Sequence, residues 1–553
     1  MRDRMGLAAA LRGGYEHRQV HGLLRSRALH VALIVVLTAI AYSDSFRGGF
    51  VSDDVTAVAE NPHLRSLAPA NLKSIATSFD DANYIPLKVF SLALDQWLWG
   101  PTPVGYHATN LALHIACALA IYVLVIRLGE TAGVAAIVAL LWAVHPVQVE
   151  SVAWISERKN VLSTLFFLLA LLTALRFSDA PRARTYLLLL GLFTCALLSK
   201  INTIVLPALM AAHEILVRRR LRTRDLLATV PLLAIGAALA WVNLHGNPSH
   251  GANYHGGSFW VTLRTTATVI PRYLSLVFAP WQLSSYYAVP LRASWLEPPV
   301  ALGATLVLAL TCAIAILGRR GRPESFWIVW FGVTLSPMLN LVPFPALMAD
   351  RYLYIPLVGV LVILVRAVRA LGRRVPPIAV AMPALTTAAV LILVWLTHTR
   401  VRVWSNEVSL WADWALRTSY ISADSPWGPP PRGEQVRLLR EALIAHPDRA
   451  ALHNNLGAIA FEENRPREAV ERLARAHALD PKDPAIALNL GRAYLLDNRV
   501  PDAVRTLEEA TMLEEPSFFA HLNLARAYQR AGEPVRARRE LERARAIRPW
   551  ARL

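Results

Sequence analysis

The stretch PPVALGATLVLALTCAIAILG, residues 298–318, contains no charged side chain and is long enough to cross the roughly 30 Å hydrocarbon layer of a membrane as one helix. The whole chain of 553 residues is 55% hydrophobic and only 17% charged, which excludes one large soluble domain. Comparable apolar stretches occur at 28–46, 105–127, 131–146, 160–177, 184–199, 201–217, 225–244, 325–343, 352–371 and 376–397. We therefore predict an all-α fold in which residues 28–400 form a polytopic membrane bundle of about 11 spans.

Arginines between these stretches predict the orientation, because short loops rich in Lys and Arg stay on the cytoplasmic side. They occur in the N-terminal tail 1–27 and in loops at 182–184, 218–224, 319–322 and 373–374. With an odd number of spans, the C-terminal part lies on the opposite side of the membrane from the tail. The composition favours a bacterial inner membrane, with the C-terminal part in the periplasm.

One further segment, residues 262–283, is apolar but contains Arg264, Pro271, Arg272 and Pro280. We interpret it as an interfacial or re-entrant element rather than a span. If it does span, the orientation of everything after it is inverted.

The net charge of +18 is scattered rather than gathered in one basic run, so the sequence gives little support to nucleic-acid binding. The three cysteines, Cys117, Cys195 and Cys312, lie far apart in separate apolar segments. They predict neither a disulfide framework nor a zinc site.

A repeat of 34 residues marks the C-terminal region. Asn455-Leu456-Gly457 returns as Asn489-Leu490-Gly491 and as Asn523-Leu524-Ala525. This interval is typical of tetratricopeptide repeats, so we predict an α-solenoid over 433–553, joined to the bundle by a linker over 401–432. We expect its concave face, with Asn455, Asn489 and Asn523, to bind an acceptor or partner protein; a spacer or self-association module is the alternative.

The predicted outer loop after the first span, residues 47–104, contains Asp53 and Asp54, followed by Glu60-Asn61-Pro62. Two neighbouring carboxylates raise each other's proton affinity, so one of them is suited to accept a proton from an attacking hydroxyl. An ordinary solvated acidic turn is the alternative interpretation of an isolated Asp-Asp pair.

Other polar residues lie between spans on the same predicted side. They are candidate ligands for a phosphate group at the membrane face, because cations next to apolar spans need anionic partners. These candidates are His145, Arg158, Lys159, Lys200 and Arg351. The alternatives are basic residues that flank a helix start, a structural His-Pro turn at His145, and a salt bridge between Asp350 and Arg351.

Four features together resemble the family of transmembrane proteins with tetratricopeptide repeats that act as protein O-mannosyltransferases of the GT-C fold: the Asp53-Asp54 loop, the stretch 145–162, the stretch 350–356 and the trailing repeats. The resemblance covers nearly the whole chain. It implies that Asp53 and Asp54 are the catalytic motif, that the donor is a sugar on a polyprenyl phosphate, and that the acceptor is a Ser or Thr hydroxyl.

We therefore expect an integral membrane glycosyltransferase that transfers a sugar, mannose by the resemblance, with inversion at the anomeric carbon. Its partners would be the lipid-linked donor, the acceptor protein and membrane lipid. A divalent metal on the two aspartates is an alternative that we do not favour, because a single phosphate demands less of a metal than a diphosphate does. A non-catalytic membrane scaffold, and a transporter or a ligase for lipid-linked glycans, are the other functional alternatives.

Overall fold

The computed structural model describes residues 26–547 except 81–82, 247–252, 288, 408, 411–412, 415–431 and 514–516. Within these residues the regular secondary structure is helical, apart from one isolated bridge between Asp80 and Asn83. The predicted all-α class is confirmed. The N-terminal tail before residue 26 and most of the predicted linker lie outside the described residues.

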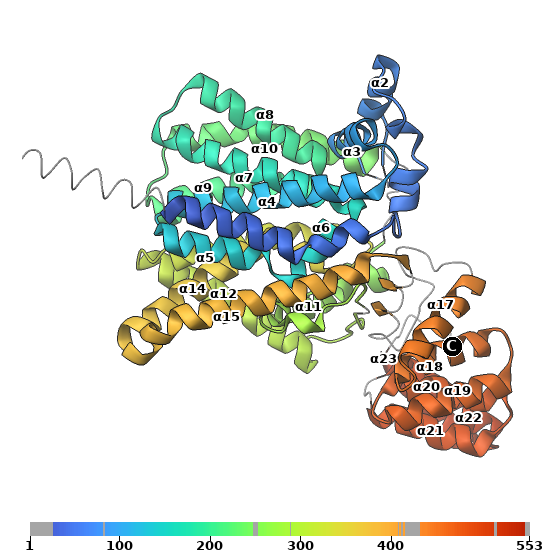
Figure 1. The fold of residues 1–553 in the computed structure, drawn as a ribbon. Helices are drawn as coiled ribbons and strands as arrows, with labels where there is room; N and C mark the ends of the chain where they lie inside the picture. The colour runs from blue at the N-terminus through green and yellow to red at the C-terminus, as the bar shows by residue number, and fades with distance from the viewer. Residues whose placement is uncertain are drawn as a thin grey trace, which may run out of the picture.

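The helical bundle and the repeat region are drawn as two bodies in Figure 1. The long helices of the bundle are Ser26–Arg47, α4 (Pro103–Arg127), α5 (Ala132–Ala143), α7 (Arg158–Asp179), α8 (Ala183–Ser199), α9 (Leu206–Ala212) with its flanking turns over Ile201–Val217, α10 (Thr223–His245), α11 (Phe259–Phe278), α12 (Pro298–Arg319), α13 (Glu324–Leu335), α14 (Leu357–Arg374) and α15 (Pro376–Val401). The first loop contributes α2 (Pro69–Thr77) and α3 (Pro86–Trp99). Each of the eleven apolar stretches therefore contains a helix.

One end of the bundle is held together by ion pairs between its short loops, and we call it the arginine-rich face. Arg127 and Arg218 both pair with Asp179, which joins the end of α4 to the ends of α7 and of the 201–217 segment. Arg366 of α14 pairs with Glu130 and Glu324. In addition, Arg219 donates to the carbonyl oxygens of Gly318 and Arg319 at the end of α12.

The opposite end carries the first loop, and we call it the outer-loop face. The Gly49 amide donates to the Ser405 carbonyl at 2.8 Å, so the chain leaves α15 beside the first loop. The Tyr84 amide donates to the Asn243 side chain at 3.0 Å, which places the end of α10 there as well. Residues that follow the last helix of the bundle thus lie on the same face as the first loop, as an odd number of passes requires.

The helix α11 does not carry the chain from one face to the other. It is a continuous helix of 20 residues that contains Pro271. The preceding α10 ends at the outer-loop face, and the following α12 ends beside Arg219 at the arginine-rich face. Between them, Val277 near the end of α11 lies 3.1 Å from His145 on the outer-loop side. Segment 262–283 therefore starts and ends on one side and leaves the orientation of later helices unchanged.

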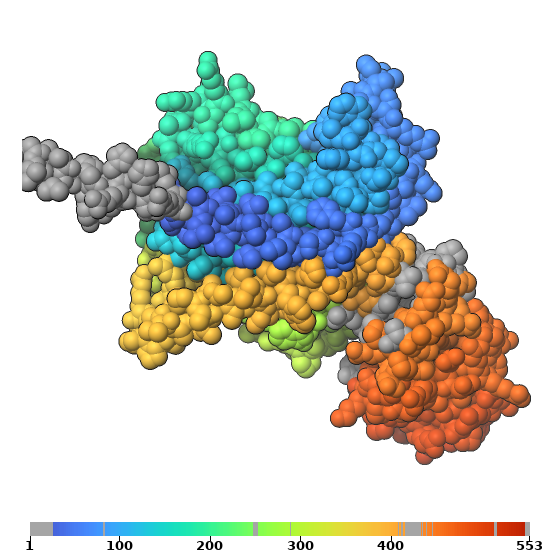
Figure 2. Space-filling view, in the orientation of Figure 1, coloured from blue at the N-terminus to red at the C-terminus, as the bar shows by residue number. Residues whose placement is uncertain are grey.

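Among the described residues, six helices are long and apolar enough to cross a membrane by themselves: Ser26–Arg47, Pro103–Arg127, Ile155–Asp179, Thr223–His245, Pro298–Arg319 and Pro376–Trp404. A pair bent by 55°, Ala132–Ala143 with Pro146–Ala153, would make a seventh span. The other predicted spans are shorter helices that run between the same two faces. Figure 2 shows the first helix, in blue, lying along α15, in yellow and orange, on the surface of the bundle.

The repeat region forms paired helices with the predicted period. The helices are α17 (Arg432–Ala445), α18 (Ala450–Glu462), α19 (Pro466–Leu479), α20 (Pro484–Leu496), α21 (Val500–Leu513), α22 (Phe518–Arg530) and α23 (Pro534–Ile547). A Cβ added at Gly457 would lie 2.6 Å from Leu473 Cγ, and one at Gly491 would lie 2.5 Å from Leu507 Cγ. The glycine of each Asn-Leu-Gly motif is therefore where the paired helices cross closely.

The turn inside each helix pair repeats as well. Asn464, Asn498 and Gly532 all have positive φ angles, of 56°, 58° and 78°, and they are spaced 34 residues apart. This left-handed conformation ends a helix and is adopted mainly by glycine and asparagine. The predicted α-solenoid is confirmed.

The assignment of faces predicts which residues a thiol reagent that cannot cross membranes will reach from one side. In a variant without the three native cysteines, single cysteines at Glu60 and Glu471 should react from the same side of oriented vesicles, and a cysteine at Arg222 only from the other. Labelling of positions 60 and 471 from opposite sides would contradict the placement of α15.

Candidate functional site

The first loop is fixed to the bundle by Asp54, whose side chain is fully buried. Its Oδ1 accepts hydrogen bonds from the amide and the hydroxyl of Ser156, both at 2.6 Å, and its Oδ2 accepts one from the Val51 amide at 3.2 Å. Burial raises the pKa of Asp54 to about 7, although the hydrogen bonds from Ser156 and Val51 lower it. Asp54 therefore acts as the anchor that joins the first loop to the stretch 145–162.

The neighbouring Asp53 is partly exposed, so the two aspartates differ in environment. The residue before it, Ser52, has a left-handed backbone with φ of 53°, which is uncommon for a residue with a Cβ. The Ser52 amide donates to the carboxylate of Glu407. This contact and the Asp54 anchor fix the backbone on either side of Asp53, and the catalytic role of Asp53 stays a prediction.

Arg158, a candidate phosphate ligand, is enclosed by the protein. Its side chain is 0% exposed and its Nη2 pairs with Asp95 at 2.6 Å and donates to the Tyr106 carbonyl at 3.0 Å. Its Nε donates to the side chain of Asn110. The Thr109 hydroxyl also donates to Asp95 at 2.7 Å. These contacts fasten α7 to α3 and α4 beneath the first loop, which is a supporting role.

Three of the other predicted cations surround one carboxylate. Glu157 lies 3.2 Å from Lys159, 3.3 Å from Lys200 and 3.5 Å from Arg351, measured between charged atoms. The two lysine side chains are each 12% exposed, whereas Glu157 is 1% exposed. We call these four residues the cation cluster. Its lysines are accessible to an anion, and its carboxylate is not.

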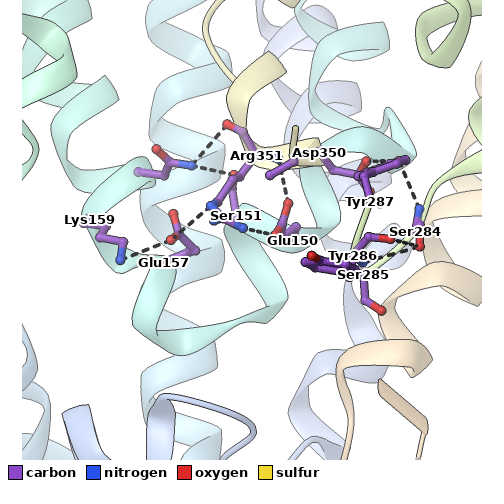
Figure 3. Close-up of polar contacts among 12 residues, drawn as sticks. Glu150, Ser151, Glu157, Lys159, Ser284, Ser285, Tyr286, Tyr287, Asp350 and Arg351 are labelled. Carbon is purple, nitrogen blue, oxygen red and sulfur yellow. Dashed lines mark hydrogen bonds and ion pairs between the residues drawn. The ribbon is translucent and has the colours of Figure 1, made fainter. Parts of the chain in front are cut away.

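The guanidinium group of Arg351 lies at the centre of Figure 3, between Glu157 and Lys159 on one side and Asp350 on the other. It pairs with Glu150 and lies over the ring of Trp154, with 5.6 Å between Cζ and the ring centroid. Two acidic side chains, Glu150 and Glu157, thus face three cationic ones, so this part of the site has an excess of one positive charge. An anion of one negative charge would balance it.

Burial lowers the pKa of Lys200 to about 8, even though Glu157 beside it raises the value. Lys200 Nζ also donates to Asn160 at 2.7 Å. This lysine is therefore positively charged at neutral pH and loses its charge in mildly alkaline solution.

Asp350 belongs to a separate polar group beside the cation cluster (Figure 3). It accepts a hydrogen bond from the Tyr287 hydroxyl at 2.5 Å and lies 3.9 Å from Arg400, which in turn pairs with Asp413 at 2.6 Å. Burial raises the pKa of Asp350 to about 8. Asp350 and Arg351 therefore have different partners: Asp350 contacts Tyr287 and Arg400, whereas Arg351 pairs with Glu150 and Glu157.

His145 lies in the bend between α5 and the helix Val149–Ala153 and is 2% exposed. One ring nitrogen is 3.2 Å from the Val147 amide and the other is 3.1 Å from the Val277 carbonyl. Both nitrogens contact backbone groups, as in the structural His-Pro turn that the sequence offered as an alternative. A contact between His145 and phosphate remains a prediction.

The three repeat asparagines lie on the first helix of successive pairs and are buried. The Asn489 amide donates to Asn454 of the preceding repeat at 3.1 Å, and Arg492 donates to Asn489 at 3.4 Å. The Asn523 amide donates to the Phe519 carbonyl at 2.8 Å. Asn455 lies 3.5 Å from Asn454. Asn454 and Asn489 therefore link the first two repeats, while binding of a partner by the three asparagines stays a prediction.

Residues 402–407, 409–410 and 413–414 follow α15 within the predicted linker and contact the site; we call them the strap. Ser405 and Glu407 of the strap accept hydrogen bonds from the first loop, as described above. In addition, Trp404 stacks on Trp154 with ring centroids 5.3 Å apart. Asp413 accepts from the Ser285 amide at 3.0 Å. The sequence WSNEVSLWADW over 404–414 carried a signal, because tryptophans and acidic residues are unusual in a flexible linker.

The side chains around Asp53 and Asp54 determine whether a metal ion could bind there. No group of three or more His, Cys, Asp or Glu side chains suited to a metal occurs among the described residues. Both oxygens of Asp54 already accept hydrogen bonds from Val51 or Ser156. A metal shared by Asp53 and Asp54 stays the alternative that we do not favour from the sequence.

The fold and the site define a class: an all-α membrane protein with an acidic loop and a cation cluster on one face, followed by tetratricopeptide repeats. Tetratricopeptide-repeat family models match residues 460–516 and 519–543. Over most of its length the chain is related to proteins named as protein O-mannosyl-transferases, which confirms the resemblance drawn from its motifs.

Two relatives and one solved structure illustrate the comparison. Protein O-mannosyl-transferase TMTC1 of Mus musculus is 38% identical over 189 residues, which are 31% of this chain and 20% of the relative. TMTC4 of Homo sapiens is 27% identical over 490 residues, 76% of this chain and 62% of the relative. The chain thus spans less than two thirds of these proteins. ArnT from Cupriavidus metallidurans, solved with undecaprenyl phosphate, aligns with a TM-score of 0.39 and 11% identity over 86% of this chain and 79% of its own.

The buried pair of Asp95 and Arg158 predicts a large loss of stability when one member is removed. Replacing Asp95 by Ala leaves the Arg158 charge buried without its carboxylate and should cost about 3–5 kcal/mol. Thermal unfolding of the purified protein in detergent measures the loss. The control is Asp179→Ala, which removes the pairs with Arg127 and Arg218 at the surface; the Asp179 side chain is 46% exposed, so each pair should contribute no more than about 1 kcal/mol. Equal effects of the two substitutions would contradict the supporting role of Arg158.

Proposed function

We propose that this protein is a membrane glycosyltransferase that moves a sugar, mannose by its relatives' names, from a polyprenyl-phosphate donor to a Ser or Thr hydroxyl of a protein. The observation that carries the proposal is the pair of hydrogen bonds from Ser156 to Asp54. Asp53 directly precedes Asp54, and Glu157 of the cation cluster directly follows Ser156. A partly exposed carboxylate and accessible cations are therefore supplied by two adjoining segments on one face of the bundle.

The reaction that these residues suit is a direct displacement. Asp53 accepts the proton of the acceptor hydroxyl while the hydroxyl oxygen forms a bond with the anomeric carbon. The bond between that carbon and the phosphate oxygen breaks on the opposite side of the sugar, which inverts the configuration. The bonding electrons leave with the polyprenyl phosphate, whose negative charge increases as it departs.

Lys159 and Lys200 are the groups that we assign to the departing phosphate. Both are cations with partly accessible side chains, and charge that develops on a leaving group is stabilised by donors already in position. Arg351 lies deeper, paired with Glu150 and Glu157, and we assign it to orienting that carboxylate and the lysines. A lipid-linked donor has its phosphate at the membrane surface. Lys159 at the start of α7 and Lys200 at the end of α8 flank apolar helices, which supports this assignment.

The repeats are assigned to binding the acceptor or a partner protein, because a solenoid of helix pairs presents an extended concave surface. They follow a helix that ends on the face of the first loop. We propose that this face is periplasmic, in a bacterial inner membrane, so that acceptor and active site share a compartment.

The role of Asp53 predicts the outcome of its isosteric replacement. In Asp53→Asn the side chain keeps its size but cannot take up the proton, so transfer of radiolabelled mannose from polyprenyl-phosphate mannose to a Ser/Thr-rich peptide should fall by about 10²–10⁴-fold. Glu60→Gln, an exposed position in the same loop, is the matched control and should retain activity. Full activity of Asp53→Asn would exclude Asp53 as the base, and no transfer by the wild type from this donor would favour the scaffold alternative.

The lowered pKa of Lys200 predicts a pH dependence for donor binding. Below pH of about 8 the lysine is charged and can bind the phosphate; above it the neutral amine binds weakly. The kcat/KM for the donor should therefore fall as the pH rises through about 8. In Lys200→Arg this fall should disappear, because a guanidinium stays protonated over this range. Lys73→Arg on α2 is the control, and an unchanged profile in Lys200→Arg would show that another group titrates.

A further inference from the structure

A cavity lies at the arginine-rich face, on the opposite end of the bundle from the proposed active site. It lies between α7, the 201–217 segment and α10, and its empty space, about 480 Å³, includes the open solvent at its mouth. In Figure 1 these helices approach the left edge of the bundle. The cavity wall is mainly apolar and includes Leu171, Leu175, Met210 and Leu226. A hydrocarbon chain fits such a lining, because only apolar surface would be removed from contact with water or other lipid.

One end of the cavity is polar. Glu214 accepts from the Ser178 hydroxyl at 2.7 Å and lies 3.4 Å from Arg218 and 3.5 Å from Arg220. It belongs to a short π-helical turn, His213–Val217, a departure from α-helical geometry that often accompanies a functional site. The cavity thus combines a lipid-like interior with charged groups at the level of the loops.

Asp225 supplies the observation that points to a ligand. Its side chain is only 9% exposed and lines the cavity. Its Oδ1 contacts Arg224 at 3.4 Å, but its buried Oδ2 has no hydrogen-bond partner in the part of the chain that the structure describes. The buried Nε of Arg224 likewise has no acceptor there. A buried acceptor and a buried donor without partners cost free energy, which a ligand that pairs with them would recover.

We propose that this cavity binds an anionic phospholipid with a hydroxyl-bearing head group, of the phosphatidylglycerol type. One acyl chain would occupy the apolar interior, the phosphate would accept from Arg224, and a head-group hydroxyl would donate to Asp225 Oδ2. The choice of an anionic lipid rests on charge. The five arginines at 218, 219, 220, 222 and 224 outnumber the three acidic residues beside them, Asp179, Glu214 and Asp225.

The head-group chemistry separates this lipid from its neutral relatives. A choline head group has no N–H or O–H to donate to Asp225, although its phosphate can still accept. An ethanolamine head group can donate and accept but adds no net negative charge to a mouth rich in arginine. The proposal does not depend on the transferase function, since it concerns the other end of the bundle.

Lipid retention by the full-length protein tests the site. The protein is placed in nanodiscs of phosphatidylcholine that contain about 10% of either phosphatidylglycerol or phosphatidylethanolamine, then released and analysed by native mass spectrometry. The wild type should keep one phosphatidylglycerol molecule in preference to either other lipid. Asp225→Ala and Arg224→Gln should each reduce this retention at least about tenfold, the effect of losing roughly 1.4 kcal/mol.

The control is Arg184→Gln, which removes an exposed arginine from the same face without altering the cavity lining. It should retain the lipid as the wild type does. Equal retention of the three lipids by the wild type, or full retention of phosphatidylglycerol in both the Asp225 and the Arg224 variants, would overturn the proposal. A preference for phosphatidylethanolamine would overturn the anionic head group. Where a variant unfolds, the selectivity of the wild type decides by itself.

Discussion

The hydrogen bonds between Ser156 and the buried carboxylate of Asp54 are the constraint on which the site depends. They join a loop that follows the first span to a turn that precedes α7, two segments about a hundred residues apart in the chain. Without this contact the partly exposed Asp53 and the cation cluster around Glu157 would belong to independent loops. Asp54 therefore holds the loop in place, and it is the partly exposed Asp53 for which we propose a role in the chemistry.

The strap, which precedes the repeats in the chain, contacts several of the elements that form the site. It contacts the first loop through Glu407, the 145–162 stretch through Trp404, and the loop at 284–287 through Asp413. Each of these contacts comes from residues that immediately follow α15. A segment first expected to be a linker thus bridges the elements of the site, and it leads toward the domain that we assign to protein binding.

Much of the fold could be predicted from the sequence, because both of its parts obey strong patterns. Long apolar stretches must form helices in a membrane, and a period of 34 residues specifies paired helices that cross at small residues. The site was predicted less completely. Asp53, Asp54, Lys159, Lys200 and Arg351 do lie on one face, since loops on one side of a membrane are brought together by the helices between them.

The differences in role depend on packing that sequence cannot show. Arg158 and Lys159 are adjacent and equally basic, yet the first residues of α7 direct Arg158 inward to Asp95 and leave Lys159 at the rim. His145 has both ring nitrogens against backbone groups of segments that are distant in the chain. The contact between Glu407 and the Ser52 amide could not be predicted from the sequence, because the two residues are more than three hundred positions apart.

The most direct test of the account is to determine where the phosphate of a bound donor lies, by electron cryomicroscopy of the protein with polyprenyl-phosphate mannose. The account predicts density for the phosphate beside Lys159 and Lys200, with the sugar between it and Asp53. A phosphate bound away from the outer-loop face, or at that face with Asp53 turned away from the sugar, would contradict it.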